Sequence, residues 1–186
     1  YIMWKKYLTT FMMFVGLLSL GGCSDDAGTT SVDETNPVTL SGVAQKGPFQ
    51  RGSSVVVYKL DNDFERTAQS VSGTLSDDLG HYSLDVTWSG LSEVEVEGYY
   101  FDELRGEIST STIKLSSIVY LNANVAVGGN INLFTTLASA RIRGLLKEGK
   151  GLLEAQDIVL SDLEEIFALV DLGDFDIGSI DLTQFE

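Results

Sequence analysis

His81 is the only histidine of the chain, so it is the single side chain available for imidazole acid–base catalysis. A serine nucleophile working with it would normally stand in a Gly-x-Ser-x-Gly turn, and the sequence does not contain one. We therefore interpret His81 as a half-exposed strand residue and predict neither catalytic residues nor enzyme activity. An envelope hydrolase that uses His81 stays open as the less favoured alternative.

Ser111 and Lys114 form a Ser-x-x-Lys pattern, which carries the nucleophile in β-lactamases. In those enzymes the motif opens a helix and is accompanied by partner motifs. Here it lies in a segment with strand character, and the sequence lacks the partner motifs. We interpret it as part of a strand.

Asp61, Asp63 and Glu65 place carboxylates at alternate positions, a spacing that could ligate Ca²⁺. An EF-hand loop that starts at Asp61 would need glycine at its sixth position, where Arg66 stands. A second acidic group comprises Asp171, Asp174, Asp176 and Asp181. Because chance clusters are common in an acidic chain, we predict no metal and no cofactor, and keep Asp61, Asp63 and Glu65 as weak Ca²⁺ candidates.

Four aromatic residues, Trp88, Tyr99, Tyr100 and Phe101, could form a platform on which sugar rings stack. In a small β-sandwich most aromatic side chains belong to the core. If alternate members of this group point outward, an exposed apolar area remains. Binding of surface glycans is therefore kept as an alternative function.

Gly128, Gly129 and Asn130 precede a predicted helix, where a glycine-rich turn can cradle a phosphate. The sequence has no Gly-x-x-x-x-Gly-Lys motif, so we predict a tight turn between a strand and a helix.

Charge and cysteine content exclude several classes of function. The 186 residues include 27 acidic and 12 basic side chains, for a formal charge of -15. Nucleic-acid binding needs clustered lysine and arginine, so we predict no nucleic-acid partner. With one cysteine and one histidine, the chain can form neither an internal disulfide nor a Cys/His zinc cluster.

The N-terminal segment has the order of a secretory signal. Lys5 and Lys6 precede an apolar run from Tyr7 to Leu20, which is short for a membrane span but suits a signal peptide. The segment ends in Leu20-Gly21-Gly22-Cys23, which resembles the lipobox of bacterial lipoproteins. The resemblance implies a signal peptide at 1–22, with Met3 as the natural start. It also implies a lipidated Cys23 that anchors the mature protein to the membrane.

Residues 23–37 predict a flexible acylated tether, because Val32 is the one aliphatic residue there suited to a core. Ser24-Asp25-Asp26 resembles the acidic export signal of surface lipoproteins in Bacteroidota. There are two alternatives. The segment is a polar tether that carries no sorting signal, or its acidic residues retain the protein at the inner membrane. We expect a cell-envelope protein at the outer membrane, with exposure at the cell surface slightly favoured.

Short alternating segments separated by turns predict an antiparallel β-sandwich over 38–121. The expected strands are 38–43, 54–60, 67–75, 81–86, 94–101 and 108–115, with 116–121 as an extension or a further strand. The strand 54–60 is rich in β-branched residues, which suggests burial on both faces.

A two-helix segment is predicted over 122–170. Leu133, Phe134, Leu137, Ala140, Ile142, Leu145 and Leu146 recur at helical spacing. Asn132 is the expected N-cap and Gly149 the expected stop. The second helix should cover 152–169, although a capping-box pattern at Ser161 allows two shorter helices. The acidic stretch 171–186 suggests a truncated longer protein.

Two motifs carry a family resemblance. They are Ser41-Gly42-Val43-Ala44-Gln45-Lys46-Gly47-Pro48-Phe49, which continues into the strand 54–60, and Asp77-Asp78-Leu79-Gly80-His81-Tyr82. They resemble the carboxypeptidase-regulatory-like, or transthyretin-like, β-sandwich of bacterial surface proteins. Over about 38–170 the chain is also similar to uncharacterised surface lipoproteins.

The resemblance implies non-catalytic scaffold or binding work. We therefore expect a structural or interaction module whose partners are the membrane, through Cys23, and surface glycans or envelope proteins.

Overall fold

The computed structural model describes residues 37–123 and 125–167, within one compact unit that spans 34–186. The predicted signal peptide, Cys23, nearly all of the tether and the stretch 171–186 lie outside the described residues. In the described part the strands are β1 (Val38–Val43), β2 (Ser54–Leu60), β3 (Arg66–Thr74), β4 (His81–Val86), β5 (Gly90–Gly98), β6 (Phe101–Asp102), β7 (Glu107–Ile108), β8 (Ile113–Leu121) and β9 (Val127–Gly128), and the helices are α1 (Leu133–Lys147) and α2 (Leu152–Phe167). The predicted fold class, mainly β with two helices at the C-terminal side, is confirmed.

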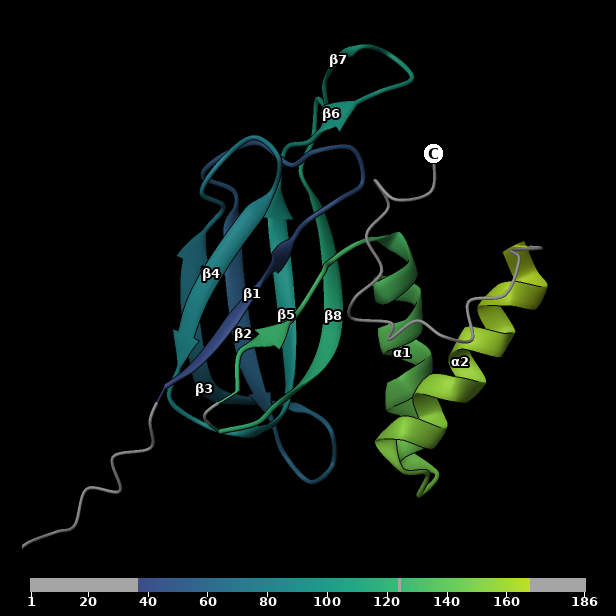
Figure 1. Ribbon diagram of the computed structural model, residues 1–186. Coiled ribbons are helices and arrows are strands. Elements are labelled where there is room, and N and C mark those ends of the chain that lie inside the picture. The colour runs from purple at the N-terminus through teal and green to yellow at the C-terminus, as the bar shows by residue number, and fades with distance from the viewer. Residues whose placement is uncertain (1–36, 124, 168–186) are drawn as a thin grey trace, which may run out of the picture. The chain divides into compact units, whose positions relative to one another are not determined.

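Two sheets face each other in Figure 1, one with the strand order β4-β1-β9 and the other with the order β3-β2-β5-β8. All pairs in them are antiparallel except β1 with β9, which run parallel. A two-stranded hairpin, β6–β7, projects from one end. The apolar core lies between the sheets because alternate residues of each strand point inward.

Strand β2 corrects one expectation. Val55 and Val57 are fully buried in the core, whereas Val56 and Tyr58 on the other face are only half-buried. The strand is therefore not buried on both faces. The reason is that its outer face carries Arg66 over the ring of Tyr58, 4.3 Å from the ring centroid, in place of apolar packing.

The expected return strand at 108–115 is also wrong in its bounds. Strand β5 ends at Gly98, and Ile108 belongs to the hairpin β6–β7. The long strand β8 begins at Ile113 and includes the whole of 116–121. Local polar bonds decide this, because the Ser109 hydroxyl accepts from the backbone N–H of Tyr100 and so starts a tight hairpin within the expected strand.

Helix α1 begins at the predicted N-cap, Asn132, which forms a capping box with Thr135. The helix ends before Gly149, whose φ of 89° continues the chain beyond the last turn. Helix α2 runs unbroken through Ser161, so the alternative of two shorter helices is wrong. In Figure 1, α1 lies beside β8 and α2 lies on the far side of α1. The contact between the two helices forms a second apolar cluster.

The buried side of α1 matches the prediction at Ile142, Leu145 and Leu146 but differs from it in the first half of the helix. Leu133 and Leu137 are 45% and 51% exposed, while Thr135, Ala138 and Ser139 are buried. The Thr135 and Thr136 hydroxyls explain the rotation, because both donate to the carbonyl oxygen of Ser116 on β8. Hydrogen bonding thus turns the first turn of the helix away from its most apolar stripe.

Candidate functional site

The β6–β7 hairpin exposes apolar side chains at one end of the sandwich. We call Tyr99, Phe101, Leu104 and Ile108 the hairpin patch; they are 47%, 36%, 100% and 43% exposed. The Asp102 carboxylate accepts from the backbone N–H groups of Leu104 and Arg105, which fixes the turn. Leu104 is therefore held fully in solvent by an ordered turn, a placement typical of interaction surfaces.

The hairpin patch lies at the end of the sandwich opposite the start of the described chain (Figure 1). Strand β1 begins at Val38, which pairs with Val86, and it runs toward Val43, which pairs with His81. Beyond that end, Phe49 bridges to Tyr100 and Pro48 accepts from the backbone N–H of Phe101. The length of the sandwich therefore lies between Val38, where β1 begins, and the hairpin patch.

The four aromatic residues of the predicted platform do not form one row. Trp88 is buried and donates from Nε1 to the Ser92 hydroxyl at 3.0 Å. Tyr100 packs on Phe49, with ring centroids 6.3 Å apart. Tyr99 and Phe101, at alternate positions, are the two members that face solvent.

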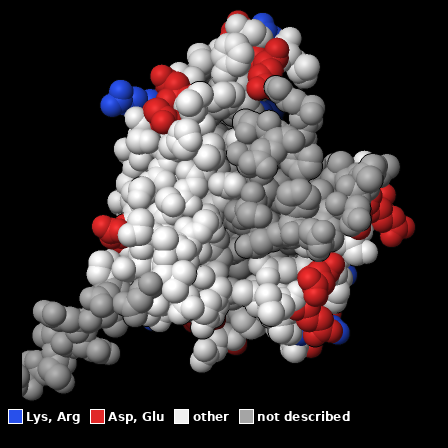
Figure 2. Space-filling view, viewed as in Figure 1, with Lys and Arg blue, Asp and Glu red and all other residues white. Residues whose placement is uncertain are grey.

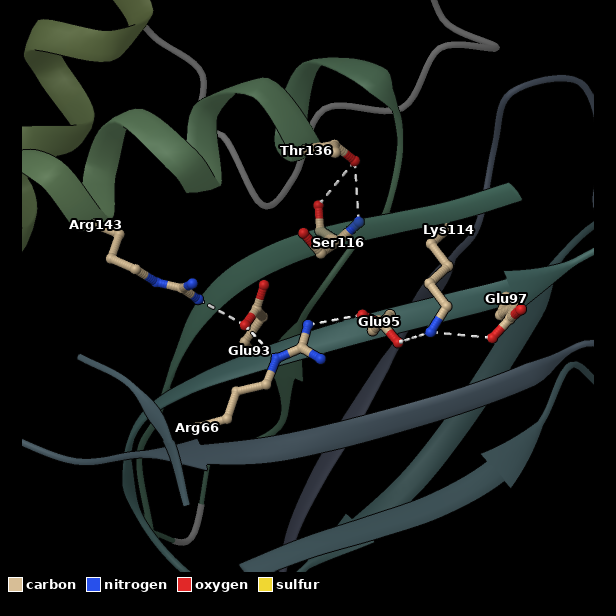
Figure 3. Close-up of polar contacts among 8 residues, drawn as sticks. All are labelled: Arg66, Glu93, Glu95, Glu97, Lys114, Ser116, Thr136 and Arg143. Carbon is tan, nitrogen blue, oxygen red and sulfur yellow. Dashed lines mark hydrogen bonds and ion pairs between the residues drawn. The ribbon is translucent and has the colours of Figure 1, made fainter. Parts of the chain in front are cut away.

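A charge network covers the outer face of the four-stranded sheet beneath α1 (Figure 3). It comprises Arg66, Glu93, Glu95, Glu97, Lys114 and Arg143. Glu93 is 5% exposed and accepts from Arg66 Nε at 2.8 Å and from Arg143 Nη2 at 2.6 Å. Burial raises the pKa of Glu93, but the hydrogen bonds and charges of Arg66 and Arg143 outweigh burial and lower it below its ordinary value.

The network continues along β5 to the surface. Arg66 Nη2 lies 2.7 Å from Glu95, and Lys114 Nζ bridges Glu95 at 3.2 Å and Glu97 at 3.1 Å. The hydrogen bond to Glu93 raises the pKa of Arg66, and the bond to Glu97 raises the pKa of Lys114. Three acidic and three basic groups are paired with one another, so the network joins α1 to the sheet and leaves no charge surplus for a ligand.

His81 lies at the surface, as predicted, with Nδ1 2.8 Å from Asp77 Oδ2. The backbone N–H of His81, and then its ring, lower the pKa of Asp77. The nearby Ser76 hydroxyl donates to the backbone oxygen of His81, away from the imidazole. In the described part of the chain, the His81 ring therefore has an acidic partner, and the neighbouring Ser76 hydroxyl is bonded away from it.

The weak Ca²⁺ candidates are each used differently. The Asp61 carboxylate accepts from the backbone N–H groups of Asp63 and Glu65, and Glu65 pairs with Lys147 at 2.5 Å. That bond lowers the pKa of Glu65. Within 37–123 and 125–167, no group of three or more His, Cys, Asp or Glu side chains gathers to hold a metal. An open hollow of about 390 Å³ lies beside this turn, lined by Asn62, Asp63, Phe64 and Lys147.

The remaining sequence motifs have structural places. Of the Ser-x-x-Lys motif, Lys114 lies within β8 and in the charge network, whereas Ser111 precedes the strand, so the predicted strand position holds for Lys114 alone. The backbone N–H of Gly129 donates to Ser41, and the Asn130 side chain accepts from the backbone N–H of Val43, so the glycine turn pairs with β1. Asp171, Asp174, Asp176 and Asp181 lie outside the described residues.

Comparison with known proteins adds little. No protein-family model matches the sequence, and no curated protein matches it significantly. A solved structure, the major plantain pollen allergen Pla l 1, aligns with 52% of this chain and 89% of its own at 16% identity and a TM-score of 0.31. That likeness is too low to assign a fold or a function. Neither described helix combines the length and apolar character that crossing a bilayer requires.

Proposed function

We propose that this chain is a non-enzymatic lipoprotein of the bacterial cell envelope that acts as a structural or interaction module. Cys23 carries the lipid, and residues 24–37 tether the sandwich to the membrane. The signal-like residues 1–22 and the Leu20-Gly21-Gly22-Cys23 motif support the anchor. The outer membrane, with the sandwich at the cell surface, is the proposed location.

The observation that carries the interaction role is the place of the hairpin patch. It lies at the end of the sandwich away from Val38, where the chain leaves the tether. An N-terminal lipid would hold the Val38 end toward the membrane and present Leu104 outward. Figure 2 shows both acidic and basic groups at its upper end. The hairpin itself holds Asp102, Glu103 and Glu107 against the basic Arg105, and this negative balance keeps it hydrated and away from anionic lipid.

In-cell photocrosslinking tests this role. A photoreactive phenylalanine analogue at position 104 should give a discrete adduct with an envelope component in a related host, because Leu104 is fully exposed. Position 153 on α2, 77% exposed, is the matched control and should give none. Phe101→Asp in the same chain should suppress the adduct. Equal labelling at both positions, or an adduct that survives Phe101→Asp, contradicts the role.

Glycan binding is the second candidate, favoured by the exposure of Tyr99 and Phe101 at alternate positions. In native gels that contain surface polysaccharide, glycan binding would retard the wild-type protein. Tyr99→Ala and Phe101→Ala should then restore its mobility, while Tyr120→Ala, at an exposed aromatic on β8, should not. Mobility that is unaffected by the polysaccharide removes this candidate.

A further inference from the structure

The described residues form two separate apolar clusters. One fills the space between the two sheets, and the other joins α1 to α2. On the helical side, Ile142 and Leu145 of α1 pack with Val159 and Leu163 of α2. The sheet and its turns add only Ile118, Leu91 and Phe64 to this second cluster. The core between the sheets therefore does not depend on the helices for its burial.

Polar bonds run along the whole contact between α1 and the sheet, beside the apolar contact at Ile118 and Leu91. Near the start of the helix, Thr136 Oγ1 accepts from the backbone N–H of Ser116 at 3.0 Å and donates to the Ser116 carbonyl at 3.2 Å (Figure 3). In its middle Arg143 binds Glu93, and at its end Lys147 binds Glu65. Water can replace the Thr136 bonds and the exposed Lys147–Glu65 pair, so these favour the docked helix only modestly. The Arg143–Glu93 pair, whose carboxylate is buried, is the strongest of the polar contacts.

The docked arrangement also carries a local cost. Among the described residues, Arg143 Nε is buried without a hydrogen-bond partner. Release of α1 from the sheet would return this N–H group to water, where it can form a hydrogen bond.

We propose that α1 and α2 form a releasable cover over the outer face of β5 and β8. The pair undocks as a unit while the sandwich stays folded. The chain is pinned to β1 as far as Ile131, whose backbone N–H donates to Val43, so the movement starts at Asn132. Release bares Ile118 and Leu91 beside the acidic row of β5, a face that the docked state hides.

Native-state hydrogen exchange on the full-length protein tests the cover. The backbone amides of α1 and α2 should exchange through an opening that leaves the amides of β2 and β5 protected. The free energy of this opening should fall less steeply with urea than the free energy of global unfolding, because less surface is exposed. If helices and sandwich exchange together, with one urea dependence, the proposal is overturned. This arm uses the wild-type chain and needs no variant to fold.

A disulfide across the docking contact supplies the second arm. The Thr136 hydroxyl lies 3.0 Å from the backbone nitrogen of Ser116, so Ser116→Cys with Thr136→Cys introduces thiols on two residues that are in contact. Loss of free thiol on oxidation shows that the disulfide has formed. Oxidation should slow exchange in both helices about tenfold or more, and reduction of the same sample should restore it. If the disulfide forms but the exchange rates of the helix amides stay unchanged, these amides exchange through local fraying of the helices and not through undocking. That result overturns the proposal.

Discussion

Glutamine in place of Glu93 removes one negative charge, with little change in volume, from the middle of the charge network. The carboxylate is 5% exposed and accepts two charge-assisted bonds, at 2.8 Å from Arg66 and 2.6 Å from Arg143. Removing one partner of a buried ion pair costs about 3–5 kcal/mol. Because the two arginine side chains stay 34% and 26% exposed, water screens them, and we expect a loss of about 2–3 kcal/mol.

Urea unfolding with two probes measures this loss. Circular dichroism follows the helices, and Trp88 fluorescence follows the sandwich, since the other tryptophan, Trp4, belongs to residues 1–22. The helix transition should move to lower urea in Glu93→Gln, with a smaller shift at Trp88. Glu97→Gln is the matched control, because Glu97 is 46% exposed and pairs with Lys114 alone; it should cost under about 0.5 kcal/mol. Equal losses in the two variants would refute the reasoning.

The same substitution predicts a change with pH. The pKa of Glu93 is lower in the folded state than its ordinary value of 4.5, so the stability that the Glu93 carboxylate contributes is present above pH 4.5. It is lost as the pH falls below 4.5 toward the lowered pKa of the folded state. Glu93→Gln should therefore lose less stability than wild type over that acid range, as measured by urea midpoints at a series of pH values.

Three further substitutions test the local geometry. Asn132→Ala removes a buried N-cap and should cost about 1–2 kcal/mol, measured by urea unfolding followed in the helix signal. Phe64→Gly should be less destabilising than Phe64→Ala by about 1 kcal/mol, because both lose the apolar contact but only glycine accepts the positive φ without strain; equal losses would argue against strain. Gly42→Ala would bring a Cβ against the Gly129 carbonyl and should lower stability by about 1–3 kcal/mol, whereas Gly128→Ala, with open space around it, should be near neutral in thermal melts.

The strand pattern was predictable where alternation and turn residues agree. Val38–Val43 and His81–Val86 have the expected bounds, because each is a short alternating run closed by a loop or glycine turn. The N-cap Asn132 was equally readable, because asparagine bonds the exposed N–H groups of a first helical turn.

Burial by a distant element was not readable from local sequence. Glu93, Glu95 and Glu97 alternate with apolar residues, which normally indicates a solvated face, yet α1 covers that face and buries Glu93. The side of α1 that packs was missed for a related reason, since Thr135 and Thr136 are held by Ser116, a residue of another element.

The hairpin patch was only partly predictable. The sequence placed most of these aromatic residues in the core and left open that alternate members face out; Tyr99 and Phe101 do face out. The turn that exposes Leu104 depends on the Asp102 carboxylate, which accepts from the Leu104 backbone N–H. In the sequence, Asp102 looks like a residue of any polar turn. Its position opposite Val38 follows from the pairing of the sheets, which no local pattern specifies.

Mass spectrometry of the N-terminal peptide tests the central proposal, the lipid anchor, most directly. The protein should be expressed with its native N-terminus in a related host and isolated from the membrane fraction. The account predicts a mature chain that begins at Cys23 and carries acyl groups, with residues 1–22 absent. A chain that keeps residues 1–22, or one cleaved there with an unmodified Cys23, would contradict it.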